Sequence, residues 1–345
     1  MANTTEIAEA AGVSQATVSR VINNQSGVAP ETVQLVQEII RRLGYRSRPR
    51  KTRRSKKTTE RIKNVAVLLL DESCHRHPTL AMAKLRGVER ALTAAGMNMI
   101  LADVSSADVT LPVLERKELD GALLWGHRVP EGLMAKLQDV PTVWLSSHVS
   151  SGDMAISQGN AAVGRLACQH LLNRNFSRLC FLMIKSDHPG FSARGEGFGY
   201  AAHLAGKEIQ RYCSDQQKPF EQLTSRELEE IAGPLVDQML ADKTRPIGLF
   251  LPDDQLTAAV YRRLQQANVK IGKEIEIISC NNEEPYLAGL HPRPATIDLG
   301  PELTGRRAVE QLLWSSQQSC ADQRRVELVV EPILIEGESW PNSDP

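Results

Sequence analysis

Apolar residues recur at helical spacing in three short segments within the first 45 residues of this 345-residue chain. The segments are separated by glycine and by a polar loop, which favour helix ends and turns. This pattern predicts three short helices packed around a small core. The apolar positions, in chain order, are Ile7, Ala8, Ala11, Val18, Val21, Ile22, Val33, Val36, Ile40 and Leu43.

The residues between these segments indicate how the helices are joined. Gly12 follows the first segment, where a chain leaving a helix adopts the positive φ that glycine tolerates best. Ser14 is a favourable N-cap for a second helix over residues 15–23, and Pro30 fits the first turn of a third. Together they predict a helix-turn-helix, although periodicity alone leaves open a three-helix bundle that binds protein.

The pattern changes at residue 64, where continuous apolar runs begin to alternate with amphipathic segments. Such runs are typical of strands buried on both faces, and the alternation predicts parallel sheets covered by helices. The sequence therefore predicts two doubly wound α/β lobes in series. Strands are expected at 65–70, 97–102, 121–125, 141–145, 179–184, 247–251 and 276–279, and helices at 78–96, 160–174, 193–206, 225–242 and 255–267.

Charge is unevenly distributed along a chain whose formal net charge is zero. Residues 1–63 carry 13 Lys and Arg against 5 Asp and Glu, and the rest carries 28 against 36. Within this basic part, residues 46–63 hold ten basic side chains and one acidic one, so they form a linker that cannot bury a core. A basic head on an acidic body predicts a polyanionic partner at one end only.

Several protein classes are disfavoured by what the sequence lacks. No apolar run approaches the ~20 residues needed to span a bilayer, and the N-terminus resembles no secretory signal, so we expect a cytoplasmic protein without a membrane partner. The scattered cysteines form no Cys-x-x-Cys pair, and we expect no cofactor and no metal. His75 and His77 have ligand-like spacing, but without a third ligand we interpret them as solvated loop residues.

The segment Ile7-Ala-Glu-Ala-Ala-Gly-Val-Ser-Gln-Ala-Thr-Val-Ser-Arg-Val-Ile-Asn23 closely resembles the headpiece of the lactose-repressor (LacI/GalR) family. The resemblance implies that the second helix lies in the major groove, with Gln15 and Ala16 choosing the operator and Arg20 reading a guanine. For Ser14 and Asn23, the alternative is a helix cap or a solvated face. The implied DNA contacts within the headpiece are Thr5, Ser14, Gln15, Ala16, Thr17, Ser19, Arg20 and Asn23.

The body also resembles this family, whose core is similar to periplasmic sugar-binding proteins. The stretches that carry the likeness are 160–164, 194–198, 252–255 and 294–298. The implied architecture is an all-α helix-turn-helix headpiece (1–45), a basic linker (46–63), an α/β two-lobed core with doubly wound parallel sheets (64–337) and a tail (338–345). The first lobe is expected to comprise about 64–159 and 293–319, and the second about 160–292 and 320–337.

The family places its effector between the lobes, beyond the carboxyl ends of the strands. There the resemblance implies a ligand-binding arginine at Arg194, polar partners at Asp253 and Asn281, and further contacts from Asp71 and Trp125. Trp125 could instead belong to the core, and Arg194 to a structural ion pair. Asn281 departs from sugar-responsive members, which often have aspartate there.

The linker departs from the family as well, because it lacks the leucine that wedges into the minor groove at the operator centre. Arg53 and Arg54 occupy nearby positions. They could enter a narrow minor groove electrostatically, or the segment could track phosphates without adding specificity.

The resemblance implies a transcriptional regulator rather than an enzyme. It would bind a near-palindromic operator in double-stranded DNA as a homodimer, with an affinity set by a small polar effector such as a carbohydrate. The alternative is a regulator with a degenerate cleft that responds to no effector.

Overall fold

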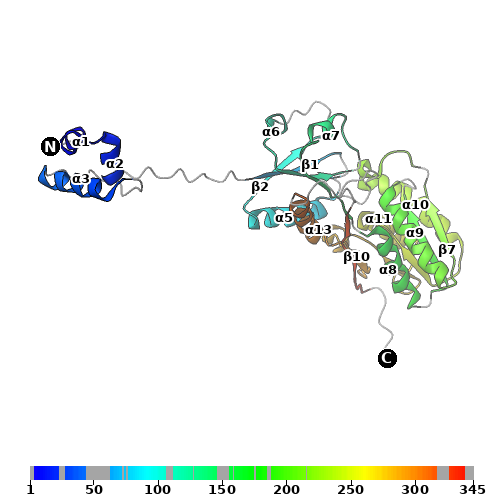
Figure 1. The fold of residues 1–345 in the computed structure, drawn as a ribbon. Coiled ribbons are helices and arrows are strands. Elements are labelled where there is room, and N and C mark those ends of the chain that lie inside the picture. The colour runs from blue at the N-terminus through cyan, green and yellow to red at the C-terminus, as the bar shows by residue number, and fades with distance from the viewer. Residues whose placement is uncertain are drawn as a thin grey trace. The chain divides into compact units, whose positions relative to one another are not determined.

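The structure is a computed structural model that describes residues 4–22, 28–43, 63–71, 74, 77–105, 112–126, 128–145, 155–157, 159–174, 176–184, 188–214, 216–316 and 326–338. The chain divides into two compact units, residues 1–61 and 62–345 (Figure 1). Among the described residues, no helix combines the length and the apolar character needed to cross a bilayer.

The first unit contains the three predicted helices, α1 (Thr4–Ala11), α2 (Gln15–Ile22) and α3 (Pro30–Arg42). Ile7, Val18 and Val36, one from each helix, are fully buried and form the centre of its core. Gly12 has φ +64° at the corner between α1 and α2, which confirms the predicted glycine turn. Three helices this short are marginal in isolation, so their stability comes from this shared core.

The second unit begins with a sheet whose six strands are all parallel. Its strand order is β11-β5-β4-β3-β1-β2. We call this sheet and its helices the first lobe. Its strands are β1 (Asn64–Leu69), β2 (Asn98–Asp103), β3 (Gly121–Trp125), β4 (Thr142–Trp144), β5 (Ala155–Ser157) and β11 (Glu327–Val329).

Helices cover both faces of this sheet, as the continuous apolar runs predict. Val65 and Val67 of β1 face a core shared with α5 (Pro78–Ala94) and α13 (Pro301–Ser315). The alternate residues Ala66 and Leu68 face the opposite core, to which the short helices α6 (Pro112–Glu115) and α7 (Leu133–Lys136) contribute. Because successive side chains of a strand point to opposite faces, a strand that is apolar throughout requires such a covered sheet.

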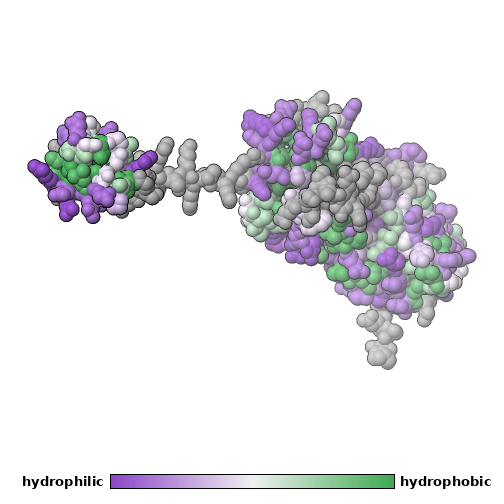
Figure 2. Space-filling view, viewed as in Figure 1, coloured by the Kyte–Doolittle hydropathy of each residue, from purple (hydrophilic) through white to green (hydrophobic). Residues whose placement is uncertain are grey.

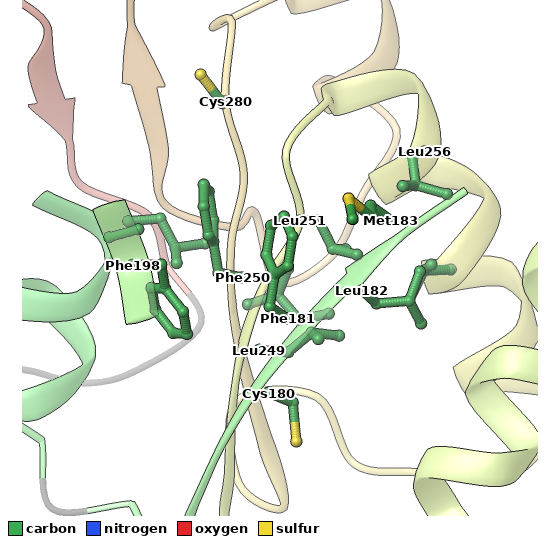
Figure 3. Packing of buried hydrophobic residues seen from close by; sticks show 14 of the residues in the cluster. Cys180, Phe181, Leu182, Met183, Phe198, Leu249, Phe250, Leu251, Leu256 and Cys280 are labelled. Carbon is green, nitrogen blue, oxygen red and sulfur yellow. The ribbon is translucent and has the colours of Figure 1, made fainter. Parts of the chain in front are cut away.

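The second lobe is built on a four-stranded parallel sheet of order β7-β6-β8-β9. Its centre holds the rings of Phe181, Phe198 and Phe250, with centroids 5.3 to 6.3 Å apart (Figure 3). This packing fixes α9 against the sheet. The elements are β6 (Arg178–Met183), β7 (Ile209–Cys213), β8 (Ile247–Phe250), β9 (Ile275–Ile278), α8 (Asn160–Leu172), α9 (Pro189–Leu204), the 3₁₀ turn Phe220–Gln222, α10 (Ser225–Ala241), α11 (Asp254–Gln266) and α12 (Glu284–Leu287).

The chain passes between the two lobes three times. It leaves the first sheet after β5 and enters α8, which packs on α9 (Figure 1). It returns after β10 (Thr296–Asp298), whose neighbour Ala295 bridges to Ile278, and then crosses again between β11 and β12 (Ile333–Ile335). β10 and β12 pair antiparallel. The last two crossings therefore lie near residues 299 and 331, somewhat later in the sequence than the expected 292 and 320.

Two glycine pairs allow helices to cross closely, one pair in each lobe. A Cβ atom on Gly87 would lie 2.0 Å from the Glu302 carbonyl oxygen, and one on Gly305 would lie 2.1 Å from that of Lys84, so α5 and α13 touch through their backbones. Gly164 and Gly197 do the same for α8 and α9.

On the face of the body seen in Figure 2, hydrophobic surface is confined to separate areas among hydrophilic ones.

Candidate DNA-binding helix and effector site

Helix α2 presents a row of polar side chains to solvent. Its buried residues, Val18 and Val21, pack into the unit's core and leave the opposite side exposed. The exposed residues on that side and just before it are Ser14, Gln15, Ala16, Ser19 and Arg20, with Thr17 half-buried. A rigid helix with short polar groups and one arginine has the shape and the chemistry to read base edges in a major groove.

The start of α2 is held by its own side chains. The Ser14 hydroxyl accepts a hydrogen bond from the Thr17 amide at 3.2 Å, so Ser14 is the predicted N-cap. The hydroxyls of Ser14 and Thr17 lie 2.9 Å apart. The cap orients both hydroxyls at the solvent-exposed end of the helix, and it is compatible with the predicted DNA contacts, which remain predictions.

Gln15 ties the first turn of α2 to the first turn of α1. Its amide nitrogen donates to the hydroxyls of Thr4 (3.0 Å) and Thr5 (3.2 Å). This places the predicted contacts Thr5 and Gln15 side by side in one patch. Asn23, Arg53 and Arg54 lie outside the described residues.

Arg194 is buried in the second lobe, with only 5% of its surface exposed, and its guanidinium makes several hydrogen bonds. Its Nε donates to Asn160 Oδ1 at 3.0 Å. Its Nη1 donates to Asn281 Oδ1 at 3.2 Å and also to the Pro252 carbonyl oxygen. None of these three acceptors is a carboxylate, so the structure offers the guanidinium polar but uncharged partners rather than the ion pair that sequence left open.

Asp253 and Asn281 meet at the same place, as predicted from their positions after β8 and β9. The Asn281 amide nitrogen donates to Asp253 Oδ2 at 3.0 Å. Asp253 Oδ1 accepts from the Leu256 amide and so caps α11. Three of the five predicted effector residues, Arg194, Asp253 and Asn281, therefore form one connected buried network.

His77 joins this network from the first lobe, and the interpretation of His77 as a solvated loop residue is wrong. It lies just before α5, and its Nδ1 is 2.7 Å from Glu283 Oε2 while its Nε2 is 3.5 Å from Asp253 Oδ2. Asp253 and Glu283 are both fully buried. The second ligand-like histidine, His75, lies outside the described residues.

Asp254 is hydrogen-bonded to the residues that position this network. Its carboxylate accepts from the Ser279 hydroxyl, the Glu283 amide (2.7 Å) and the Thr296 hydroxyl (3.2 Å). The pKa of this carboxyl is raised to about 7, chiefly by burial and also by the nearby acidic groups of Asp253 and Glu283, against the hydrogen bonds from Glu283 and Ser279, which lower it. Asp254 thus fixes the loop that carries Glu283.

The remaining two predicted residues, Asp71 and Trp125, lie together at the carboxyl ends of β1 and β3 in the first lobe. Asp71 Oδ2 accepts from the Arg128 amide at 3.0 Å. The Trp125 ring is half-buried, and the Lys84 ammonium lies 4.3 Å from its centroid. Lys84 is a contact that sequence analysis missed, because a lysine inside an amphipathic helix gives no sign of being buried.

Asn160, His77 and Glu283 were also missed. Asn160 opens α8 and reaches Arg194 on α9 across the glycine crossing, and His77 reaches Glu283 across 206 residues of sequence. The Asn160 stretch was part of the family resemblance, so its place in the sequence was a usable signal. The two-residue spacing to His75 drew attention to His77, but this spacing does not predict the contact with Glu283.

The two units each match a known family. Residues 4–48 match the bacterial regulatory proteins of the lacI family, and residues 168–340 match the periplasmic binding protein-like domain. The ribose operon repressor of Escherichia coli K12 is 27% identical over 345 residues, spanning 97% of this chain and 99% of that protein. The transcriptional repressor PurR of Pectobacterium carotovorum is 28% identical over 352 residues, spanning 98% and 97%.

Solved structures share the fold of the whole chain. A transcriptional regulator CelR in complex with cellobiose superposes with a TM-score of 0.62 at 21% identity, covering 98% of this chain and 100% of that one. The Lac repressor dimer bound to operator and an anti-inducer gives a TM-score of 0.62 at 16% identity, covering 98% of each chain. The predicted fold class, a helical headpiece followed by a periplasmic-binding-protein-like core, is confirmed.

Proposed function

Because the chain belongs to the lacI family of bacterial regulatory proteins, with a periplasmic binding protein-like domain after its helix-turn-helix, we propose that it represses transcription from an operator whose affinity a small polar effector controls. The observation that carries this proposal is the exposed polar row of α2 on a helix-turn-helix with its own core. The relatives are transcriptional repressors, and we propose no enzymatic activity. Because we propose chromosomal DNA as its partner, we expect the protein to act in the cytoplasm, associated with the nucleoid when bound to DNA.

We expect two copies of the chain to bind a near-palindromic operator, one headpiece on each half-site. The Lac repressor is a dimer on its operator, which supports this arrangement. The basic linker would add phosphate contacts that increase affinity on any sequence.

Replacing Arg20 with alanine is expected to weaken binding to the preferred operator by about 10- to 100-fold, because a bidentate arginine–guanine contact contributes ~1–3 kcal/mol of discrimination. The operator is first selected from random duplexes with the full-length protein. Dissociation constants are then measured on the selected duplex and on a scrambled one at the same salt concentration.

Arg42→Ala is the matched control, since it removes one exposed positive charge from α3 rather than from α2. We expect this variant to lose little affinity, and to lose it equally on both duplexes. Equal losses for Arg20→Ala on both duplexes would show that Arg20 contacts phosphate only.

The effector is expected to bind where Arg194, Asp253 and Asn281 converge, between the lobes. The ribose operon repressor, the PurR proteins and the CelR–cellobiose complex together suggest sugars and purines as the first compounds to test. The second candidate, a regulator without an effector, is favoured by one observation. Arg194 already donates to three protein oxygens, so a ligand would have to displace some of them.

Thermal denaturation against sugars, sugar phosphates, sugar acids and purines distinguishes these two candidates. A ligand at about 1,000 times its Kd stabilises the native protein by about 4 kcal/mol, a shift that is readily detected. We expect the shift to vanish in Arg194→Met and to persist in Arg226→Ala, an exposed arginine of the same body. Each variant is compared with its own ligand-free midpoint, and a full shift in Arg194→Met would place the effector elsewhere.

A further inference from the structure

We propose that His77, Asp253 and Glu283 form a binding site for a divalent first-row transition metal ion, of which zinc is the best probe, and that this ion joins the two lobes. The inference goes beyond the proposed function and does not depend on it. It also replaces the expectation from sequence that the chain holds no metal.

The three side chains converge from separate parts of the chain. One ligand atom from each lies within 4.8 Å of the other two. His77 comes from the start of α5 in the first lobe, Asp253 from the end of β8 and Glu283 from the loop after β9 in the second. Ligand atoms about 2.0–2.2 Å from one tetrahedral ion lie roughly 3.5 Å from each other. The His77 Nδ1–Glu283 Oε2 pair, now 2.7 Å apart, would therefore open, and the more distant ligand atoms would approach, both through side-chain rotation.

An unsatisfied buried atom points to a missing partner in this cluster. Glu283 is fully buried, and its Oε2 is bound to His77. Its Oε1 has no hydrogen-bond partner among the described residues. A buried carboxylate oxygen left unpaired costs free energy, so native proteins rarely retain one without a water or an ion beside it.

The charges of the cluster favour a cation. Asp253, Asp254 and Glu283 place three fully buried carboxyl groups in one hydrogen-bonded network. The nearby guanidinium of Arg194 donates to uncharged oxygens of Asn160, Pro252 and Asn281. A divalent ion would offset the negative charge of Asp253 and Glu283 more fully than the single imidazole of His77 does.

The donor set selects the class of metal. One imidazole nitrogen with two carboxylate oxygens suits zinc, manganese, iron(II) or nickel, whereas calcium and magnesium prefer oxygen alone and copper(I) prefers sulfur. The Asn281 amide donates to Asp253 Oδ2 and so orients this ligand from outside, as is usual around metal sites. Three protein ligands leave a coordination position for water or for an effector oxygen.

The ion's position between lobes gives it a consequence for regulation. His77 is the ligand from the first lobe, and the other two ligands belong to the second. A metal held by all three would favour the lobe arrangement in which they converge. Metal occupancy would then shift the same equilibrium that an effector shifts.

Titration of untagged, full-length, chelator-treated protein with zinc chloride tests the site, with stoichiometry from elemental analysis and affinity from competition with a chelating dye. We expect one zinc per chain with a Kd below 1 μM, and at least a tenfold weaker Kd in both His77→Gln and Glu283→Gln. His203→Gln, which changes an exposed histidine on α9, should bind like the wild type. All proteins carry Cys213→Ser, because an exposed thiol could bind zinc by itself.

Two further readouts separate a specific site from a folding defect. Zinc should raise the thermal midpoint of the parent protein but not that of either variant, and cobalt(II) in place of zinc should give a visible absorption band only in the parent. Failure to retain zinc at 10 μM, or equal affinity in the parent and both variants, would overturn the proposal. Neither DNA nor an organic effector is present, so these outcomes leave the proposed function untouched.

Discussion

Replacing Gly164 with alanine is expected to lower the free energy of unfolding of the body by about 3 kcal/mol or more. A Cβ atom at this position would lie 2.0 Å from the Arg194 carbonyl oxygen and 2.4 Å from the Phe198 amide nitrogen. Both are backbone atoms of α9, so no side-chain rotation relieves the clash, and α8 and α9 must move apart. Urea denaturation followed by circular dichroism measures the loss.

Gly233→Ala is the matched control for this substitution. Gly233 also lies inside a helix, α10, but a Cβ atom there would meet nothing within 4 Å. Alanine is the better helix former, but Gly233 precedes Pro234, whose ring disfavours the helical conformation of a preceding residue that has a Cβ. These effects oppose each other, so the control should change stability by less than about 1 kcal/mol. If both variants changed stability alike, the close approach of α8 and α9 would not matter energetically.

The Gly164 variant should also respond less to an effector, because the crossing positions two residues of the proposed effector site. Asn160 and Arg194 face each other across it, and their hydrogen bond is 3.0 Å long. A helix displacement comparable to one bond length breaks this contact. The effector-induced shift in thermal midpoint, measured relative to the variant's own baseline, is therefore expected to shrink.

Replacing Lys84 with methionine is expected to stabilise the body by about 2 kcal/mol at pH 7. Burial lowers the pKa of this lysine from 10.5 to about 8, and a shift of this size corresponds to about 3 kcal/mol of destabilisation of the charged form. The ammonium donates weakly to the Leu145 carbonyl oxygen at 3.5 Å. Losing that bond offsets about 1 kcal/mol of the gain.

The size of this destabilisation depends on pH. The folded protein binds the Lys84 proton less tightly than the unfolded chain does, so the destabilisation is fully present below about pH 8. It diminishes between about pH 8 and 10.5 and vanishes above 10.5, where both states are neutral. Denaturation midpoints of wild type and Lys84→Met should therefore differ most at pH 7 and converge by pH 10.5. Lys207→Met, an exposed lysine, should match the wild type throughout.

The elements predicted correctly are those whose own sequence carries a strong pattern. The apolar runs of β1, β6 and β8 required burial on both faces, and the glycine turn of the headpiece required Gly12. The strands β5, β10, β11 and β12 were missed because each is only three residues long, whereas β4, which is equally short, lies within the longer expected strand 141–145. β7 was missed because it is an edge strand with polar, exposed residues and therefore lacks a continuous apolar run.

The buried network around Arg194, which we propose as the effector site, was predicted only in part for a similar reason. Asp253 and Asn281 follow strands β8 and β9, so their position at the carboxyl edge of the sheet could be foreseen, whereas Arg194 was expected from the family resemblance. The contact of His77 with Glu283 depends on how the two lobes meet, and no local pattern encodes that. Burial of Lys84 likewise depends on helix α13, which reaches α5 from more than 200 residues away.

The first lobe is completed by α13 and β11, which the ribosome makes only after the four-stranded sheet of the second lobe. Until these residues emerge, the face of β1 that carries Val65 and Val67 lacks the cover of α13. The second lobe, by contrast, has its four-stranded sheet once residue 278 has been made. During synthesis the sheet that begins first in the sequence is therefore the later one to be completed, and a premature stop codon after residue 300 would release a chain with one complete sheet and one incomplete lobe that is prone to aggregation and proteolysis.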